Sequence, residues 1–164
     1  MKKADTLELR KFVAPEIVFG EGALKKAANY ALNFGTKKVL LVTDPEVAKA
    51  GWSKKIENDL NKLSIPYIVF KDITSNPKDH EVMSGAEVYR NEGCDVIIAV
   101  GGGSPMDCAK GIGVVSTNNK HILEFEGVNK VSIPGPPLIC IPTTAGKFFN
   151  ARGQESTLQN LKRR

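Results

Sequence analysis

The stretch DVIIAVGGGSPMDCAKGIG, residues 95–113, contains the clearest indication of how this chain folds. Residues 95–100 (DVIIAV) are continuously apolar after the aspartate, which is typical of a parallel strand covered by helices on both faces. Three glycines at 101–103 follow the run directly, and a helical pattern extends over 104–115. A buried strand, a glycine turn and a helix in direct succession predict part of a β-α-β unit.

Similar runs and helical patterns flank this stretch. Short apolar runs occur at 38–43, 67–70 and 138–141, and each predicts another strand. Between them, apolar side chains recur at the spacing of an amphipathic helix. These side chains are Ile56, Leu60 and Leu63 in one segment, and Val82, Ala86 and Tyr89 in the next. The alternation predicts an α/β fold with a Rossmann-like parallel sheet and flanking helices.

Two further elements are expected before this core. Residues 15–19 (PEIVF) predict an N-terminal edge strand or hairpin, and residues 23–34 predict a helix. The helix prediction depends on Leu24, Ala28 and Ala31, which would share one face.

Composition and charge exclude several classes of protein. The 164 residues suit one domain, and no apolar run reaches the length of about 18 residues that a membrane span requires. Three scattered cysteines without a CxxC pair favour free thiols in a reducing cytoplasm. The net charge is +5, but the tail at 147–164, with five basic residues and one acidic residue, carries four of these charges. We therefore expect neither a membrane nor a nucleic acid as partner.

The glycine turn is the strongest candidate for a binding site. Ser104 is expected to cap the following helix, Pro105 suits its first position, and Asp107 resembles the acidic partner of a capping box. Such a helix N-terminus attracts phosphate through its free N–H groups and its dipole. A plain tight turn would need fewer than three glycines, which favours the phosphate site. Neither GxGxxG nor a P-loop is present.

Residues at the ends of two other predicted strands are secondary candidates. A carboxylate at Asp44 could accept both hydroxyls of an adenosine ribose and would repel a 2′-phosphate, which favours NAD over NADP. Considered alone, however, Asp44 fits an Asp-Pro turn better. Thr143 and Thr144 could bind a ribose or phosphate, or could equally close a loop as an ST-turn.

Together these motifs resemble the iron-dependent (group III) alcohol dehydrogenase family over about residues 12–146. The resemblance includes PEIVFGEGA at 15–23, LLVTD at 40–44, SNP at 75–77, GGGSPMD at 101–107 and IPTTAG at 141–146. It implies hydride transfer between an alcohol or aldehyde and NAD, with NADP less favoured. The positions that it implies for cofactor contact are Asp44 at the adenosine ribose, Asn76 in the nucleotide groove, Gly101, Gly102, Gly103 and Ser104 around the pyrophosphate, Asp107 beneath that loop or near the nicotinamide, and Thr143 and Thr144 on the next strand.

The chain also departs from the family pattern. The resemblance implies a second, helical domain that binds Fe²⁺ through one aspartate and three histidines, whereas this sequence has only His80 and His121. Both are expected on the surface, so neither iron nor zinc is expected to bind. We predict a dinucleotide-binding domain over 1–146 and a divergent, frayed tail over 147–164, with the metal-binding helical domain absent. Cys108 is interpreted as a packing residue.

These observations predict the NAD-binding portion of an alcohol dehydrogenase that is not catalytically complete by itself. No residue is assigned a catalytic role. The alternative is a non-catalytic nucleotide-binding or regulatory module. The resemblance implies that the absent helical domain would cover apolar surface of this domain. Such exposed apolar surface, together with an N-terminal edge strand, predicts a homodimer or larger assembly.

Overall fold

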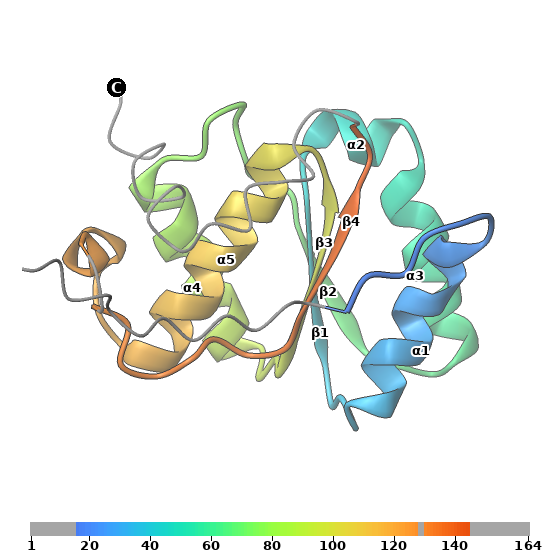
Figure 1. The fold of residues 1–164 in the computed structure, drawn as a ribbon, viewed down its shortest axis with the longest axis horizontal. Helices are drawn as coiled ribbons and strands as arrows, with labels where there is room; N and C mark the ends of the chain where they lie inside the picture. The colour runs from blue at the N-terminus through green and yellow to red at the C-terminus, as the bar shows by residue number, and fades with distance from the viewer. Residues whose placement is uncertain (1–15, 128–129, 145–164) are drawn as a thin grey trace, which may run out of the picture.

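The structure, a computed structural model, describes residues 16–127 and 130–144. A parallel sheet with the strand order β2-β1-β3-β4 lies between two layers of helices (Figure 1). The α/β fold with a Rossmann-like sheet is therefore confirmed. The strands are β1 (Val39–Thr43), β2 (Tyr67–Phe70), β3 (Val96–Gly101) and β4 (Leu138–Pro142).

The helices divide between the two faces of the sheet, with α4 and α5 on one face and α1 and α3 on the other (Figure 1). Short helical turns connect the larger elements. The helical elements are η1 (Ala23–Lys25), α1 (Lys26–Asn33), α2 (Pro45–Lys49), α3 (Trp52–Lys62), α4 (Asp79–Asn91), α5 (Gly103–Asn118) and η2 (Ile122–Phe125).

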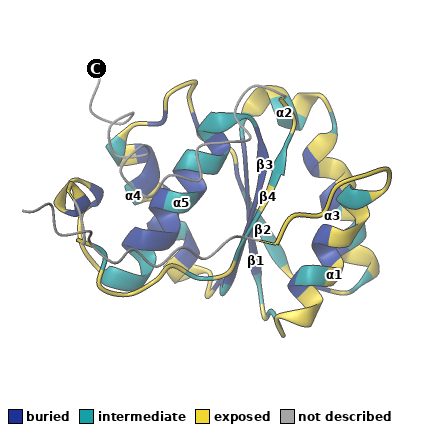
Figure 2. Ribbon diagram, viewed as in Figure 1, coloured by how far each residue is buried: buried dark blue, intermediate teal, exposed yellow. Residues whose placement is uncertain are grey.

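The central strands supply both hydrophobic cores. Because successive side chains of a strand point to opposite faces, Leu40 and Val42 of β1 pack toward α4 and α5, whereas Val39 and Leu41 pack toward α1 and α3. Every residue of β1 and β3 is buried, and Figure 2 shows the buried residues concentrated in the sheet and on the inner faces of the helices. This burial on both faces explains the continuous apolar runs.

The predicted helical faces are largely confirmed. Val82, Ala86 and Tyr89 of α4 are buried, and so are Ile56 and Leu60 of α3. Leu63 is half-buried just beyond the end of α3. The expected helix over 23–34 forms as η1 followed by α1, with Ala28 and Ala31 buried.

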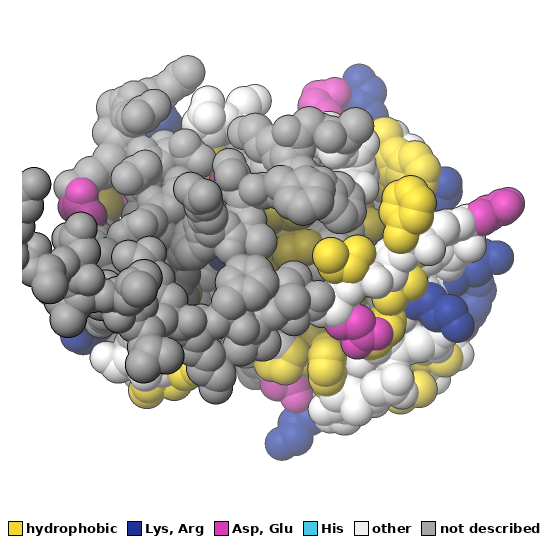
Figure 3. Space-filling view, viewed as in Figure 1, with side chains coloured by type: hydrophobic (Ala, Val, Ile, Leu, Met, Phe, Trp, Pro, Cys, Tyr) yellow, Lys and Arg dark blue, Asp and Glu magenta, His cyan; other side chains and the backbone are white. Residues whose placement is uncertain are grey.

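The expected N-terminal edge strand is wrong for the residues that the structure describes. Residues 16–19 form no helix or strand, and Pro15 lies outside the described residues. A strand needs a neighbour for its N–H and C=O groups, and no strand of the described sheet pairs with this segment. Its side chains are exposed instead, Phe19 to 94% and Ile17 to 65%. Figure 3 shows hydrophobic side chains gathered on the face formed by this segment and α1.

Two other expectations concern the C-terminal tail and membrane-spanning helices. The predicted tail at 147–164 lies outside the described residues. Within 16–127 and 130–144, no helix is both long enough and apolar enough to cross a membrane.

Candidate functional site

The carboxyl edge of the sheet brings together most of the predicted site residues. A Cβ placed on Gly101 would lie 3.3 Å from Asp44 Oδ2, and one on Gly102 would lie 3.4 Å from Thr144 Oγ1. The backbone N–H of Thr143 donates to the Gly101 carbonyl oxygen over 2.9 Å. The ends of β1, β3 and β4 therefore meet at the glycine loop, as expected when parallel strands end at one edge.

Gly101 is needed for two separate reasons. Its φ is +150°, a conformation that other residues rarely adopt. A Cβ at this position would also lie 2.6 Å from Cγ of Pro105, well inside van der Waals contact. The turn from β3 into α5 is therefore tight enough to exclude any side chain.

The start of α5 differs from the expected capping arrangement. Gly102 is the N-cap, in an extended conformation, and no side chain in the described part of the chain caps the helix. The predicted N-cap at Ser104 and the predicted capping box with Asp107 are therefore wrong. Gly103 takes up the helical conformation itself, so the helix begins before Ser104 and places Pro105 third, where a missing N–H also costs nothing.

This uncapped helix end leaves hydrogen-bond donors available. The first N–H groups of a helix have no partner within it, so the N–H groups of Gly103 and Ser104 have no intrahelical acceptor. They stand at the positive end of a helix of 16 residues. This combination favours an anion such as phosphate.

Asp44 has one oxygen occupied and one near the glycine loop. Oδ1 accepts from the N–H of Val47 over 2.8 Å and caps α2, with Pro45 at the first helical position. Asp44 therefore has a structural role, but as the cap of a short helix and not as the turn residue that we expected. Oδ2 is the oxygen that faces the Cβ position of Gly101, so this capping role leaves an acceptor beside the loop.

Asp107 lies on the side of the glycine loop nearer to β4. Its Oδ1 is 3.4 Å from Nζ of Lys110, one turn along α5. Desolvation raises the pKa of Cys140 on β4, and the two charges act on it in opposite directions, Lys110 lowering this pKa and Asp107 raising it. Asp107 thus pairs with a neighbour along its own helix and does not cap it.

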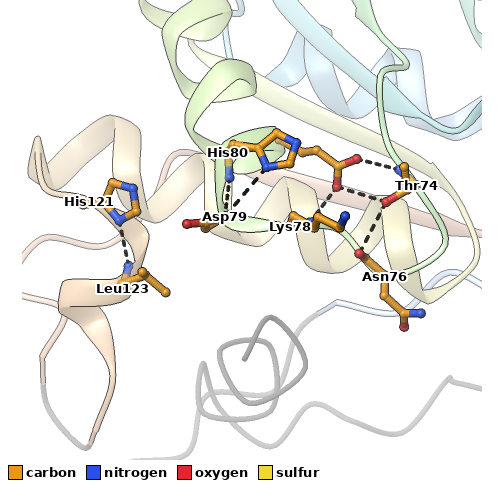
Figure 4. Close-up of polar contacts among 8 residues, drawn as sticks. Thr74, Asn76, Lys78, Asp79, His80, His121 and Leu123 are labelled. Carbon is orange, nitrogen blue, oxygen red and sulfur yellow. Dashed lines mark hydrogen bonds and ion pairs between the residues drawn. The ribbon is translucent and has the colours of Figure 1, made fainter. Parts of the chain in front are cut away.

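The loop after β2, which contains Asn76, is held by a residue of α4 that sequence analysis missed. Asn76 is exposed, and its side chain points away from the hydrogen bonds that join Thr74 to Lys78 (Figure 4). Those bonds converge on Glu81, a buried carboxylate in the first turn of α4. A glutamate three residues after the N-cap was the available signal, but Lys78 is not an ordinary capping residue.

The two histidines do not form a metal site. His80 is exposed, with Nδ1 lying 3.8 Å from Oδ1 of Asp79, and His121 accepts the N–H of Leu123 at Nδ1 (Figure 4). Across 16–127 and 130–144, no three His, Cys, Asp or Glu residues are grouped so as to hold a metal ion. The described residues therefore do not fit the iron site that the resemblance implies.

The cysteines differ in their exposure. Cys94 and Cys108 are buried, whereas Cys140 is exposed. Burial raises the pKa of Cys94 to about 11 and that of Cys108 to about 12, so both remain protonated at neutral pH. Cys108 is therefore a packing residue, as expected, because the thiolate is the reactive form.

A family profile described as iron-containing alcohol dehydrogenase matches residues 14–150. Among curated proteins, the chain is similar to the NAD-dependent methanol dehydrogenase of Bacillus methanolicus. The two are 36% identical over 135 residues, which cover 82% of this chain and 35% of the relative. The chain spans about a third of the length of this relative.

Solved structures agree with the profile. The fold matches a crystal structure of 1,3-propanediol oxidoreductase with a TM-score of 0.79 and 36% identity, covering 85% of this chain and 37% of the other. It also matches sulfoacetaldehyde reductase from Bifidobacterium kashiwanohense in complex with NAD⁺. That TM-score is 0.74 with 28% identity, and the match again covers 85% of this chain and 37% of the other.

Proposed function

The chain belongs to the iron-containing alcohol dehydrogenase family, and we propose that it binds NAD as the cofactor-binding portion of an enzyme that transfers hydride between an alcohol or aldehyde and this cofactor. The observation that supports this proposal most directly is the uncapped α5 N-terminus behind a glycine loop, with an acceptor oxygen of Asp44 beside it. The nicotinamide ring, when bound, supplies the site that accepts or donates hydride.

Each group at the carboxyl edge has a role in this proposal. The N–H groups of Gly103 and Ser104 donate to the pyrophosphate, and the absence of a Cβ at Gly101 and Gly102 lets it approach the backbone. Asp44 accepts the adenosine ribose hydroxyls with the oxygen that does not cap α2. A 2′-phosphate at that position would be repelled, so we expect NAD to be preferred over NADP.

The strand order gives the cofactor a direction across the edge. The pyrophosphate would lie at the end of β3, and the ribose would lie toward β1, where Asp44 stands. The adenine would then lie toward β2 and the loop that contains Asn76. The nicotinamide would extend the other way, toward β4, where Asp107, Thr143 and Thr144 lie.

Catalysis by this chain alone is not part of the proposal. Hydride transfer requires a substrate held against the nicotinamide ring, and we assign no described residue to that task. The substrate would be a small alcohol or aldehyde in the complete enzyme. The three free thiols suit a reducing compartment such as the cytoplasm.

Calorimetric titration with NAD⁺ and NADP⁺ tests the proposal directly. We expect saturable binding of both with higher affinity for NAD⁺, and no alcohol oxidation by the chain alone. Absence of binding by either dinucleotide would refute the cofactor role. Binding without turnover after addition of Fe²⁺ or Zn²⁺ would agree with a cofactor-binding portion, whereas turnover would show that the chain itself is a complete enzyme.

Self-association is a second part of the proposal. The large exposed hydrophobic side chains belong mainly to the segment at 16–19 and to α1 and its end, and they include Ile17, Val18, Phe19, Leu32 and Phe34. Exposed apolar surface of this kind favours a homodimer or larger assembly. A monomer in light scattering at micromolar concentration would contradict it.

A further inference from the structure

Glu81 is a buried carboxylate whose hydrogen bonds all lead to one loop. Its side chain is in the first turn of α4, and the residue is only 7% exposed. Oε1 accepts from the N–H of Thr74 over 3.0 Å, and Oε2 accepts from the N–H of Lys78 over 2.6 Å. Oε2 also lies 3.3 Å from the hydroxyl of Thr74.

These contacts exceed what a helix cap requires. A capping glutamate reaches back to the N–H of the N-cap residue, which here is Lys78. Glu81 in addition holds Thr74, which lies four residues before the N-cap. Both ends of the segment 74–78 are therefore held by one side chain, and charge-assisted hydrogen bonds of this kind are stronger than neutral ones.

Asn76 lies at the middle of this held segment. Its backbone N–H donates to the carbonyl oxygen of Thr74 over 3.0 Å, which tightens the turn. Its side chain points away from the network of Thr74 and Lys78, as Figure 4 shows, and no residue that the structure describes forms a hydrogen bond with it. The segment follows β2, whose carboxyl end stands beside that of β1 and Asp44.

We propose that Glu81 is a positioning residue, which holds the 74–78 segment so that Asn76 contacts the adenosine half of the cofactor. This inference rests on the proposed function. It assigns a binding role to a side chain that itself touches no cofactor, and it predicts an effect confined to ligands that contain adenosine.

The test measures the affinities of NAD⁺ and ADP by calorimetry for the wild-type chain, Glu81→Gln and Glu124→Gln. Glutamine retains one acceptor oxygen, but its amide NH₂ would face the backbone N–H of Thr74 or Lys78, so one of the two hydrogen bonds is lost. We expect Glu81→Gln to lower the affinities for NAD⁺ and for ADP by the same factor, about tenfold. Glu124 is the matched control, because it reaches back to the N–H of His121 in the same way at the start of η2.

A double-mutant cycle separates positioning from a general structural role. If Glu81 acts through Asn76, then Glu81→Gln will cost little further affinity in the Asn76→Ala background. Equal losses in both backgrounds would overturn the inference, and so would an unchanged ADP affinity in Glu81→Gln. A wild-type chain that binds neither ligand would refute the proposed function, and this inference with it.

Thr74→Val provides a second variant that does not disturb a buried charge. Thr74 is exposed, and this change removes a hydroxyl that lies 3.3 Å from Oε2 of Glu81 and 3.4 Å from the carbonyl oxygen of Asn76, both within the held segment. We expect the affinity for ADP to fall about threefold, in line with loss of one hydroxyl whose two contacts are both long. Unchanged affinity would contradict the inference even if Glu81→Gln did not fold.

Discussion

The two ends of the parallel strands, here the amino edge and the carboxyl edge of the sheet, differ in how completely their polar groups are hydrogen-bonded. At the amino edge, the carboxylate of Asp95 accepts the N–H groups of Lys37 and Lys38 over 2.9–3.2 Å, and the N–H of Asp95 donates to the carbonyl oxygen of Lys38. The ammonium of Lys38 also pairs with Glu92. The amino ends of β1 and β3 are thereby joined to each other.

At the carboxyl edge, several polar groups have no partner among the described residues. The hydroxyl of Thr43 is fully buried and has no hydrogen-bond partner among the described residues. The α5 N-terminus has no capping side chain there, and Asp44 keeps one oxygen near the glycine loop. The amino edge therefore contributes stability, whereas the unpaired groups of the carboxyl edge are the ones that our proposal assigns to the cofactor.

The largest effect is expected from Gly101→Ala at the carboxyl edge. The added methyl would meet Pro105, so the loop must shift from the position that we assign to the pyrophosphate. We expect the calorimetric affinity for NAD⁺ to fall about 100-fold, with roughly 1–3 kcal/mol lost from the free energy of unfolding.

Gly51→Ala is the control for this change. Gly51 also has a positive φ, of 81°, but a Cβ there would meet nothing within 4 Å. Its substitution should reduce stability through backbone strain without altering NAD⁺ affinity. Wild-type NAD⁺ affinity in Gly101→Ala would show that the loop does not approach the cofactor.

Asp95→Ala tests the amino edge. Removing this carboxylate leaves two backbone N–H groups without their acceptor, so we expect the free energy of unfolding in urea to fall by about 1–2 kcal/mol. The affinity of the folded protein for NAD⁺ should not change. Asp59→Ala, which removes an exposed pair with Lys62, should cost less than about 0.5 kcal/mol. A weaker affinity for NAD⁺ in Asp95→Ala would contradict the division between the edges.

Asp44→Asn separates charge from capping at the carboxyl edge. Asparagine caps a helix as well as aspartate does, so stability should be retained while the negative charge is lost. We expect NAD⁺ affinity to fall about fivefold and the difference between NAD⁺ and NADP⁺ to narrow. Asp44→Ala should show the same change in preference and also lose about 1 kcal/mol of stability with the cap. A wild-type preference for NAD⁺ in both variants would exclude our role for Asp44.

The last prediction concerns two buried thiols, one near each edge, and it affects stability alone. The pKa values of Cys94 and Cys108 rise from the ordinary 9.0 to about 11 and about 12. Between pH 9 and these values the unfolded chain binds fewer protons than the folded chain, so stability falls as pH rises. Urea unfolding at pH 7.5 and 10 should show this loss, with a smaller loss in Cys108→Ala. An equal loss in wild-type chain and variant would mean that the thiol of Cys108 does not contribute.

Sequence reasoning predicted well those features that depend on local patterns. Continuous apolar runs predicted β1 to β4. The i, i+4 spacing in α3 and the buried face of α4 were also correct, because the helix face that packs on the sheet carries apolar residues at the helical period. The start of α5 was predicted wrongly. A serine before a proline is a typical cap, but here Gly103 already belongs to the helix, so Ser104 lies inside it.

The wrong prediction for residues 16–19 has a different cause. Their β-branched and aromatic residues satisfy the composition of a strand, but pairing requires a neighbouring strand, which a single segment cannot specify. Glu81 was missed for a related reason. Its importance comes from Thr74, seven residues earlier, and a contact across a loop has no sequence period.

By itself, the sequence determined the parallel α/β architecture, the glycine turn after β3 and the family, because these follow from hydrophobic periodicity and from short motifs with local chemistry. Only the tertiary structure decided which groups remain available at the carboxyl edge. Whether an N–H or a carboxylate oxygen is free depends on every neighbour that could pair with it, and those neighbours are brought together only when the strands align side by side.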